Sequence, residues 1–127
     1  MKQITIDPDG YSPNDIVERL HRCIDSGVYG LDYTILARDK NEEFYQNYNI
    51  TQEERIAILR KLTPANHDGW ELSNDPNHSQ DVIHFFHSSA QLFPRGVEEA
   101  PLQNVRLYIK LTWTKSGNFL IVISFHD

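Results

Sequence analysis

The chain has little cysteine and no long apolar run, and each scarcity excludes a class of protein. One cysteine among 127 residues, Cys23, cannot form an internal disulfide, which fits a reducing compartment and predicts a cytoplasmic protein. The apolar runs are far shorter than a membrane span, and residues 1–10 lack the pattern of a signal peptide, so we expect no membrane association. The six glycines are scattered and form no nucleotide-binding loop.

Basic residues are also scarce relative to acidic ones. The chain carries 12 Lys and Arg against 18 Asp and Glu, a formal net charge of −6. Non-specific binding to nucleic acids depends on neutralising phosphates, so this balance does not favour it, and DNA is not an expected partner. Binding of RNA would have to use a local basic patch, whereas the acidic remainder suits a basic protein partner.

Helices are expected in the first half of the chain, which we interpret as part of a single domain over residues 1–127. Residues 1–11 form an N-terminal arm with a short strand candidate at 3–6. Ser12 and Pro13 begin a helix that carries Ile16, Val17 and Leu20 on one face. A shorter helix is expected over 39–48, and the capping box of residues 51–54 opens a third helix.

Strands are expected at 33–36 and 82–87 and in a closing hairpin over 104–127. The segments 64–81 and 88–104 are rich in Pro, Asn, Asp, Ser and Gly or contain breakers, and they predict two long loops. Helices followed by a meander of strands favour an α+β fold. We therefore predict N-terminal helices packed on a C-terminal antiparallel sheet of about three to five strands.

The closing hairpin is the most informative part of the sequence, because its first strand alternates strictly between apolar and polar residues. A three-residue loop at 115–117 predicts the apolar pairs Trp113–Phe119, Leu111–Ile121, Ile109–Ile123 and Leu107–Phe125. The same register predicts the opposite-face pairs Lys110–Val122, Tyr108–Ser124 and Arg106–His126. A two-residue turn would set Lys110 opposite Ile123, which disfavours that register.

One face of this hairpin is therefore expected to gather Arg106, Tyr108, Lys110, Ser124 and His126. Arginine and lysine bind phosphate, and histidine exchanges protons near neutral pH, so the set is a candidate site for a phosphate and for proton transfer. The alternative is an ordinary solvated sheet face, on which Lys, Arg and Thr are common.

Two further residues are candidates outside the hairpin. His84 lies in an otherwise apolar strand, where a polar side chain is costly unless it is hydrogen-bonded. The alternative to a role in the site is a hydrogen-bonded or exposed histidine on an edge strand. Trp70 either caps the core, which we favour, or stacks on a base as a substrate-binding residue. The spacing of the histidines is unlike a zinc motif, and no metal or other cofactor is expected.

Six short segments also have a recognisable order and spacing. They are residues 36–41 (LARDKN), 50–51 (IT), 58–64 (ILRKLTP), 81–85 (DVIHF), 107–111 (LYIKL) and 123–126 (ISFH). In this order they resemble the MqsR-type toxin family of bacterial toxin–antitoxin systems, over about residues 31–127. The resemblance implies a RelE-like α+β fold, metal-independent cleavage of single-stranded messenger RNA, and inhibition by a cognate antitoxin.

Residue by residue, the resemblance implies catalytic roles for three positions. The active-site tyrosine of the family corresponds to Tyr108, its C-terminal basic residue to His126, and a polar position on the middle strand to His84. The chemistry adds Lys110 as a catalytic residue that stabilises the phosphate, and both Lys110 and Arg106 as substrate-binding residues. The family's lysine after the second helix has no counterpart around residues 66–69, and this departure motivates the alternative hypothesis. In that alternative the chain is an inactive relative, or an immunity or antitoxin-like protein that binds a basic partner.

Overall fold

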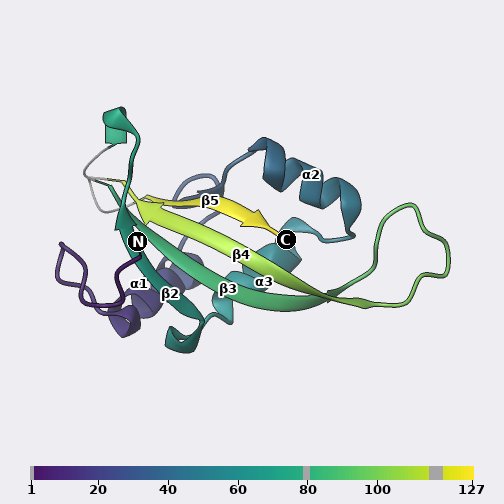
Figure 1. Ribbon diagram of the computed structural model, residues 1–127, viewed down its shortest axis with the longest axis horizontal. Coiled ribbons are helices and arrows are strands. Elements are labelled where there is room, and N and C mark those ends of the chain that lie inside the picture. Colours follow the sequence, from purple (N-terminus) through teal and green to yellow (C-terminus); the bar gives the residue numbers. More distant parts are fainter. Residues whose placement is uncertain (1, 79–80, 115–118) are drawn as a thin grey trace.

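The computed structural model describes residues 2–78, 81–114 and 119–127, and it combines three α-helices with a five-stranded sheet (Figure 1). The helices are α1 (Pro13–Ser26), α2 (Asp39–Asn47) and α3 (Gln52–Arg60). The strands are β1 (Tyr33–Ile35), β2 (His67–Leu72), β3 (Val82–Leu92), β4 (Gln103–Trp113) and β5 (Leu120–His126). The fold is α+β with N-terminal helices, as the order of patterns predicts.

The sheet is mixed rather than purely antiparallel. Its order is β1-β5-β4-β3-β2, in which β1 runs parallel to β5 and the other neighbours are antiparallel. The prediction of an antiparallel sheet is therefore wrong for one strand. A parallel neighbour needs a long crossover between the paired strands, and the chain from α2 to β4 supplies it.

The capping signals of the sequence mark the starts of α1 and α3 correctly. Ser12 accepts a hydrogen bond from the Asp15 amide while the Asp15 carboxylate accepts one from the Ser12 amide. Thr51 and Glu54 form the same reciprocal pair. Both helices bury apolar residues against one face of the sheet, and Figure 1 shows them behind the strands. The core contains residues from both layers, among them Leu20, Leu59, Leu107, Ile109, Leu111 and Phe125.

Helix α2 closes the end of β5 that β1 does not reach. The side chain of Asn41 is fully buried and bonds to the strand as a neighbouring backbone would. Its Nδ2 donates to the carbonyl of Ile123 at 3.1 Å, and its Oδ1 accepts from the amide of Phe125 at 2.9 Å. Nδ2 also donates to the Leu36 carbonyl at 2.9 Å, which ties β1 to the helix. This arrangement satisfies backbone groups that burial would otherwise make costly.

Both predicted long loops are shorter than the sequence suggests. The segment 64–81 contains β2, a strand interrupted by a register shift between His67 and Gly69, so it does not alternate. The segment 88–104 is shortened from both sides, since β3 extends to Leu92 and β4 begins at Gln103. Polar residues such as Ser88 and Gln103 lie opposite core residues in these strands, so the sequence there lacks a clean alternation of apolar and polar residues.

The predicted register of the closing hairpin is wrong. The pairs are Trp113–Leu120, Thr112–Ile121 and Leu111–Val122, and then Lys110–Ser124, Ile109–Phe125 and Tyr108–His126. A bulge leaves Ile123 as the extra residue of β5 between the two sets. It allows Val122 and Phe125, three residues apart, to face the same core. The predicted turn at 115–117 lies outside the described residues.

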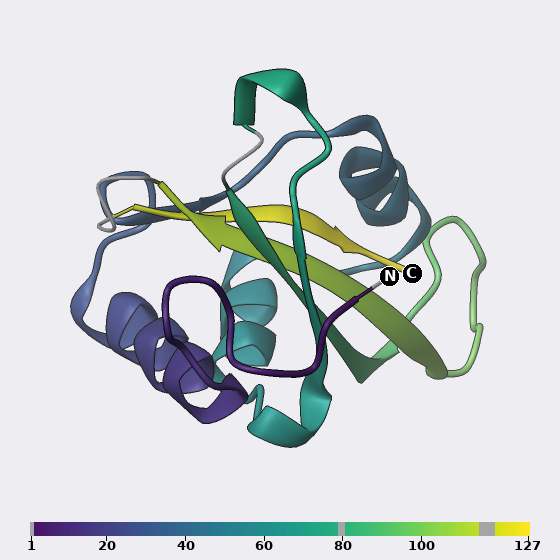
Figure 2. The same ribbon diagram turned by 60° about the vertical axis from the view of Figure 1, so that its left-hand side comes forward.

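The N-terminal arm crosses the free edge of β2 and continues to α1 (Figure 2). Gln3 and Trp70 exchange two backbone hydrogen bonds of 2.7 Å, which makes an isolated bridge where the predicted strand 3–6 was expected. Gly69 permits this close crossing, because a Cβ at this position would lie 2.5 Å from the Gln3 carbonyl oxygen. The arm thereby covers a strand edge that would otherwise be open to other chains.

Candidate functional site

Four polar side chains form one row across four neighbouring strands on the sheet face that α1 and α3 do not cover. His87 of β3 lies opposite Tyr108 of β4, and Tyr108 lies opposite His126 of β5. On the other side of His87, Asp68 reaches it from the irregular part of β2. We name Asp68, His87, Tyr108 and His126 the polar row. Residues directly opposite each other in a sheet have Cβ atoms about 5 Å apart, so neighbouring members are within reach of one ligand.

The Asp68–His87 pair is the most tightly defined part of the polar row. His87 Nδ1 lies 2.6 Å from Asp68 Oδ1, and the two side chains are 47% and 33% exposed. A carboxylate only accepts hydrogen bonds, so Nδ1 carries the proton and Nε2 of the neutral ring has a free lone pair. This orientation is the one that a carboxylate gives to a histidine acting as a general base.

Tyr108 and His126 complete the row at its other end. Tyr108 is 49% exposed, and it stands between the two histidines. The Nδ1 atom of His126 lies 2.9 Å from the backbone oxygen of Asp127, and its Nε2 atom takes no part in this hydrogen bond. The bulge at Ile123 sets His126 beside Tyr108, where the predicted register had placed it beside Arg106.

Cationic groups lie next to the polar row on the same face. Lys110 pairs with Ser124, whose hydroxyl accepts a 2.9 Å hydrogen bond from Arg38 Nη1, and Arg106 lies two residues from Tyr108. Lys2 lies on the same face, over Phe85, and the carboxylates of Asp68 and Glu71 accompany these cations. These cations gather on one face of a chain that carries 12 Lys and Arg against 18 Asp and Glu overall. Such a local basic patch is what RNA binding requires here.

The structure brings together Arg106, Tyr108, Lys110 and His126 on one face, as the alternation predicts. It adds Asp68, His87 and Arg38, which the sequence interpretation did not select. His87 had a usable signal, since it faces away from the core in the same strand as His84. Asp68 had none, because its segment resembles a loop and its partner is distant in sequence.

The structure does not bring His84 together with the other predicted site residues. His84 pairs with the core-facing Leu111, is only 2% exposed and lies on the helix-covered face. Its Nε2 lies 3.1 Å from Asp7 Oδ2, and its Nδ1 lies 3.1 Å from His67 Nε2. His84 and His87 are three residues apart, an odd spacing that places them on opposite faces of a strand. We name Asp7, His84 and His67 the buried relay.

The buried relay has a defined proton arrangement. Because the Asp7 carboxylate accepts, His84 donates from Nε2 and its Nδ1 accepts from His67. Asp7 also accepts from the amides of Asp9 and Tyr11 at 2.9 Å, so it organises the turn that ends the arm. Burial, reinforced by His67, lowers the pKa of His84 to about 4, and burial also lowers the pKa of His67. The relay is thus a neutral-histidine anchor for the arm.

Trp70 belongs to the same anchor rather than to the polar row. Its indole nitrogen donates to the Thr5 carbonyl at 2.9 Å, and its backbone pairs with Gln3. Trp70 lies opposite His84, on the helix side of β2, so it does not face the site of Tyr108. The structure therefore does not bring Trp70 together with Tyr108 and His126, and its contacts with Thr5 and Gln3 hold the arm.

A cleft of about 590 Å³ lies between the arm, α1 and the ends of β3 and β4. Asp7, Tyr11, Arg19, His84 and Trp113 contribute to its lining. No member of the polar row lines this cleft, so the cleft is separate from the candidate site. Among the described residues, no group of three or more His, Cys, Asp or Glu is arranged to hold a metal ion.

Within the described residues, no helix is both long and apolar enough to cross a membrane. Comparisons of the chain with protein-family models, with curated proteins and with solved structures find no match.

Proposed function

We propose that this protein is a toxin-like endoribonuclease that cleaves single-stranded RNA without a metal ion, in the cytoplasm. The observation that carries the proposal is the polar row, in which two histidines flank Tyr108 and one of them is oriented by Asp68 at 2.6 Å. The sequence resemblance to MqsR-type toxins supports the same activity through Tyr108 and His126.

We name the sheet face that α1 and α3 do not cover the open face. Metal-independent RNA cleavage requires only groups that this face supplies. A base removes the proton of the ribose 2′-hydroxyl, the 2′-oxygen attacks the adjacent phosphorus, and the bond to the 5′-oxygen breaks as that oxygen receives a proton. The products are a 2′,3′-cyclic phosphate and a 5′-hydroxyl. Cations and hydrogen-bond donors stabilise the additional charge that develops on the phosphate.

We assign these catalytic roles to atoms of the polar row. His87 Nε2 is the base, because Asp68 holds the proton on Nδ1. His126 lies two strands away, about 10 Å between backbones, and protonates the leaving oxygen. Tyr108 stands between them and donates to the phosphate, with Lys110 adjacent. This spacing leaves room for one phosphodiester with a histidine on either side.

The direct test is incubation of a mixed single-stranded RNA with the purified protein in excess chelator. We expect cleavage with cyclic phosphate ends, and none when the same sequence carries 2′-O-methyl groups. Tyr108→Phe and His126→Gln are expected to lower the rate by about 100-fold each. Intact RNA after incubation with folded wild-type protein across several sequences would overturn the proposal.

A cognate antitoxin is proposed as the protein partner, because a site this exposed is accessible to RNA unless another chain covers it. Expression of the wild type is expected to arrest growth, and expression of His126→Gln is not. If the wild type neither cleaves RNA nor arrests growth, a binding-only protein with a basic partner becomes the better description. Acidic residues in the first turns of α1, α2 and α3 would then be the surface to test.

A further inference from the structure

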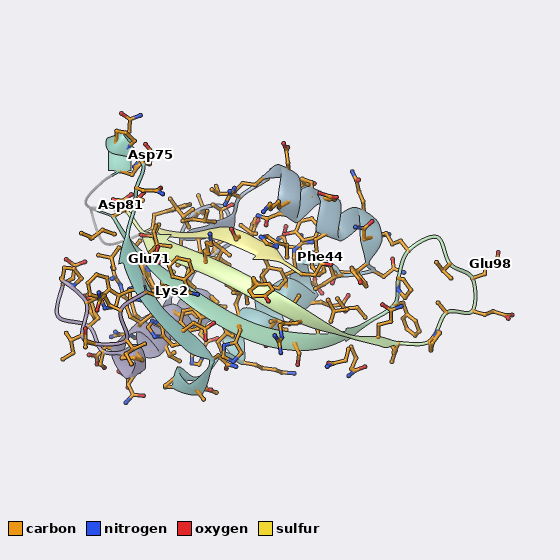
Figure 3. All side chains as sticks on the ribbon, viewed as in Figure 1. Lys2, Phe44, Glu71, Asp75, Asp81 and Glu98 are labelled. Carbon is orange, nitrogen blue, oxygen red and sulfur yellow. The ribbon has the colours of Figure 1, made fainter. Side chains whose placement is uncertain are left out.

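An aromatic ring on the open face has two ammonium groups close to it. Phe85 of β3 has Lys2 Nζ at 4.8 Å and Lys110 Nζ at 5.3 Å from its ring centroid. Lys2 comes from the arm and Lys110 from β4, so segments far apart in sequence converge on one ring. Figure 3 labels Lys2 over the strands on the face turned toward the reader.

The position of Phe85 is not explained by the core. Val82, His84 and Phe86 of β3 are buried against the helices, whereas Phe85 alternates to the other face and is only partly buried. Its neighbour on β2 is Gly69, which has no side chain to cover the ring. The ring therefore lies on the sheet face opposite the helices, partly exposed and in contact with two lysines.

Gly69 also explains how Lys2 reaches the ring. A side chain at this position would collide with the arm, since a Cβ would lie 3.1 Å from Lys2 Cβ and 2.5 Å from the Gln3 oxygen. The glycine, with φ of +117°, lets the arm cross close to β2 and places Lys2 beside Phe85. The Gln3–Trp70 bridge and the Asp7–His84 contact then hold the arm in this position.

We infer that Phe85, Lys2 and Lys110 form a nucleobase-binding subsite, in which an unpaired base stacks on the ring and the two ammonium groups bind the flanking phosphates. The inference rests on the proposed ribonuclease function. Every base has a face that stacks on an aromatic ring, and lysines that contact the ring can swing to nearby phosphates. We name these three residues the stacking subsite.

The stacking subsite is placed to hold the nucleotide next to the cleaved bond. Phe85 and His87 are two residues apart on β3 and share a face, a separation of about 7 Å. One extended nucleotide spans this distance, so a base on Phe85 sets the neighbouring phosphate at the polar row. Lys110 borders both, because it pairs with Phe85 and lies two residues from Tyr108.

Binding to a cleavage-resistant RNA tests the subsite separately from the chemistry. The probe is a fluorescein-labelled, fully 2′-O-methylated decamer of mixed sequence, measured by anisotropy. Phe85→Leu is expected to weaken binding about 10-fold. The matched control is Phe93→Leu, which removes an exposed phenyl group outside the strands and is expected to leave affinity within twofold.

An abasic scan identifies stacking as the cause. Removing the base at each position of the decamer in turn should weaken wild-type binding at one position most strongly. At that position Phe85→Leu and the wild type should bind equally, because the ring has no base to stack on. Equal affinities of Phe85→Leu and wild type for the intact decamer, with both proteins folded by circular dichroism, would overturn the subsite.

The lysines are tested through salt. Lys2→Ala should reduce the slope of log affinity against log salt by about 0.7, the value for one lost phosphate contact on a single strand. Lys61→Ala, an exposed lysine at the end of α3 behind the sheet, is the control and should not change the slope. An unchanged slope for Lys2→Ala would show that this ammonium group only covers the ring, and would overturn its part in the subsite.

The two proposals fail in different ways. If the wild type binds the decamer with the Phe85 dependence described but does not cut unmodified RNA, the ribonuclease proposal fails and the subsite stands. If the wild type cuts RNA and Phe85→Leu binds and cuts equally well, only the subsite fails. No binding of the decamer by folded wild-type protein would overturn both.

Discussion

Strand β3 carries two histidine–aspartate pairs, three residues apart, on opposite faces of one sheet. His87 and Asp68 meet on the open face with their side chains 47% and 33% exposed, whereas His84 and Asp7 are 3% and 1% exposed. The residue types are the same in both pairs, although Asp68 contacts Nδ1 of His87 at 2.6 Å and Asp7 contacts Nε2 of His84 at 3.1 Å. The two pairs differ in their environments. The exposed pair can exchange a proton with a ligand. Burial keeps the histidine of the other pair unprotonated, and that pair holds the arm in place.

The largest expected effect comes from exchanging the histidines for glutamine one at a time. His87→Gln should lower the rate of RNA cleavage by about 100-fold or more, because glutamine cannot act as a general base. His84→Gln should change that rate less than about threefold at a temperature where the variant is folded. Single-turnover cleavage assays in chelator measure both. A larger loss of activity for His84→Gln than for His87→Gln would contradict the assignment of catalysis to the exposed pair.

For the two aspartates the larger effect is expected in the buried pair, on stability: replacing Asp7 should destabilise the protein more than replacing Asp68. Asp7→Ala leaves His84 and the amides of Asp9 and Tyr11 without their acceptor in a buried place, and should lower the free energy of unfolding by about 3 kcal/mol. Asp68→Ala removes an exposed contact and should cost about 0.5 kcal/mol or less. Urea unfolding followed by circular dichroism gives both values.

Acid should destabilise the protein through the buried relay. The folded-state pKa values of His84, about 4, and His67 are lowered below the ordinary 6.5 by burial. As the pH falls below 6.5 the unfolded chain binds protons that the folded chain excludes, so stability is fully present above that pH and declines below it. Each histidine contributes up to about 1.4 kcal/mol per pH unit.

Unfolding experiments between pH 6.5 and 5 isolate this effect, because most carboxylates titrate at lower pH. The slope of stability against pH should be shallower in His84→Gln, which cannot be protonated there. Parallel curves for wild type and His84→Gln would show that the buried relay does not govern the acid response.

The smallest effect is expected at Arg106, which lies on the open face two residues along β4 from Tyr108. Arg106→Gln should weaken binding of single-stranded RNA only about three- to fivefold, the value of one solvent-screened phosphate contact. Lys110→Gln, beside the polar row, should weaken it more. Comparing the RNA affinities of these two variants shows how far the RNA-binding surface extends along β4. Equal effects would place the RNA path along the whole strand.

Local rules predict much of the fold. The capping boxes at Ser12 and Thr51 identify α1 and α3, and the alternation of β4 identifies the face that Tyr108 and Lys110 share. These features depend on neighbours within a few residues, so the sequence displays them directly. The identity of the core-facing residues in β4 follows from the same alternation.

Non-local contacts account for what the sequence does not predict. Strand β2 shows no alternation because a register shift interrupts it, and the arm that pairs with its other edge lies far away in sequence. The bulge at Ile123 depends on packing both Val122 and Phe125 into one core. His84 and Trp70 resemble site residues until the position of the arm is known, because only Asp7 and Thr5 reveal what they bind.

The extra residue of β5 has a consequence for changes in gene length. If the codon for Ile123 were deleted in frame, Val122 and Ser124 would become neighbours, and the strand could pair regularly with Leu111 and Lys110. Phe125 would still face the core and His126 would still lie opposite Tyr108, at the cost of the carbonyl that Asn41 binds. This strand can therefore shorten by one amino acid without moving its terminal histidine, whereas a deletion within the strictly alternating β4 would invert every side chain on one side of the cut.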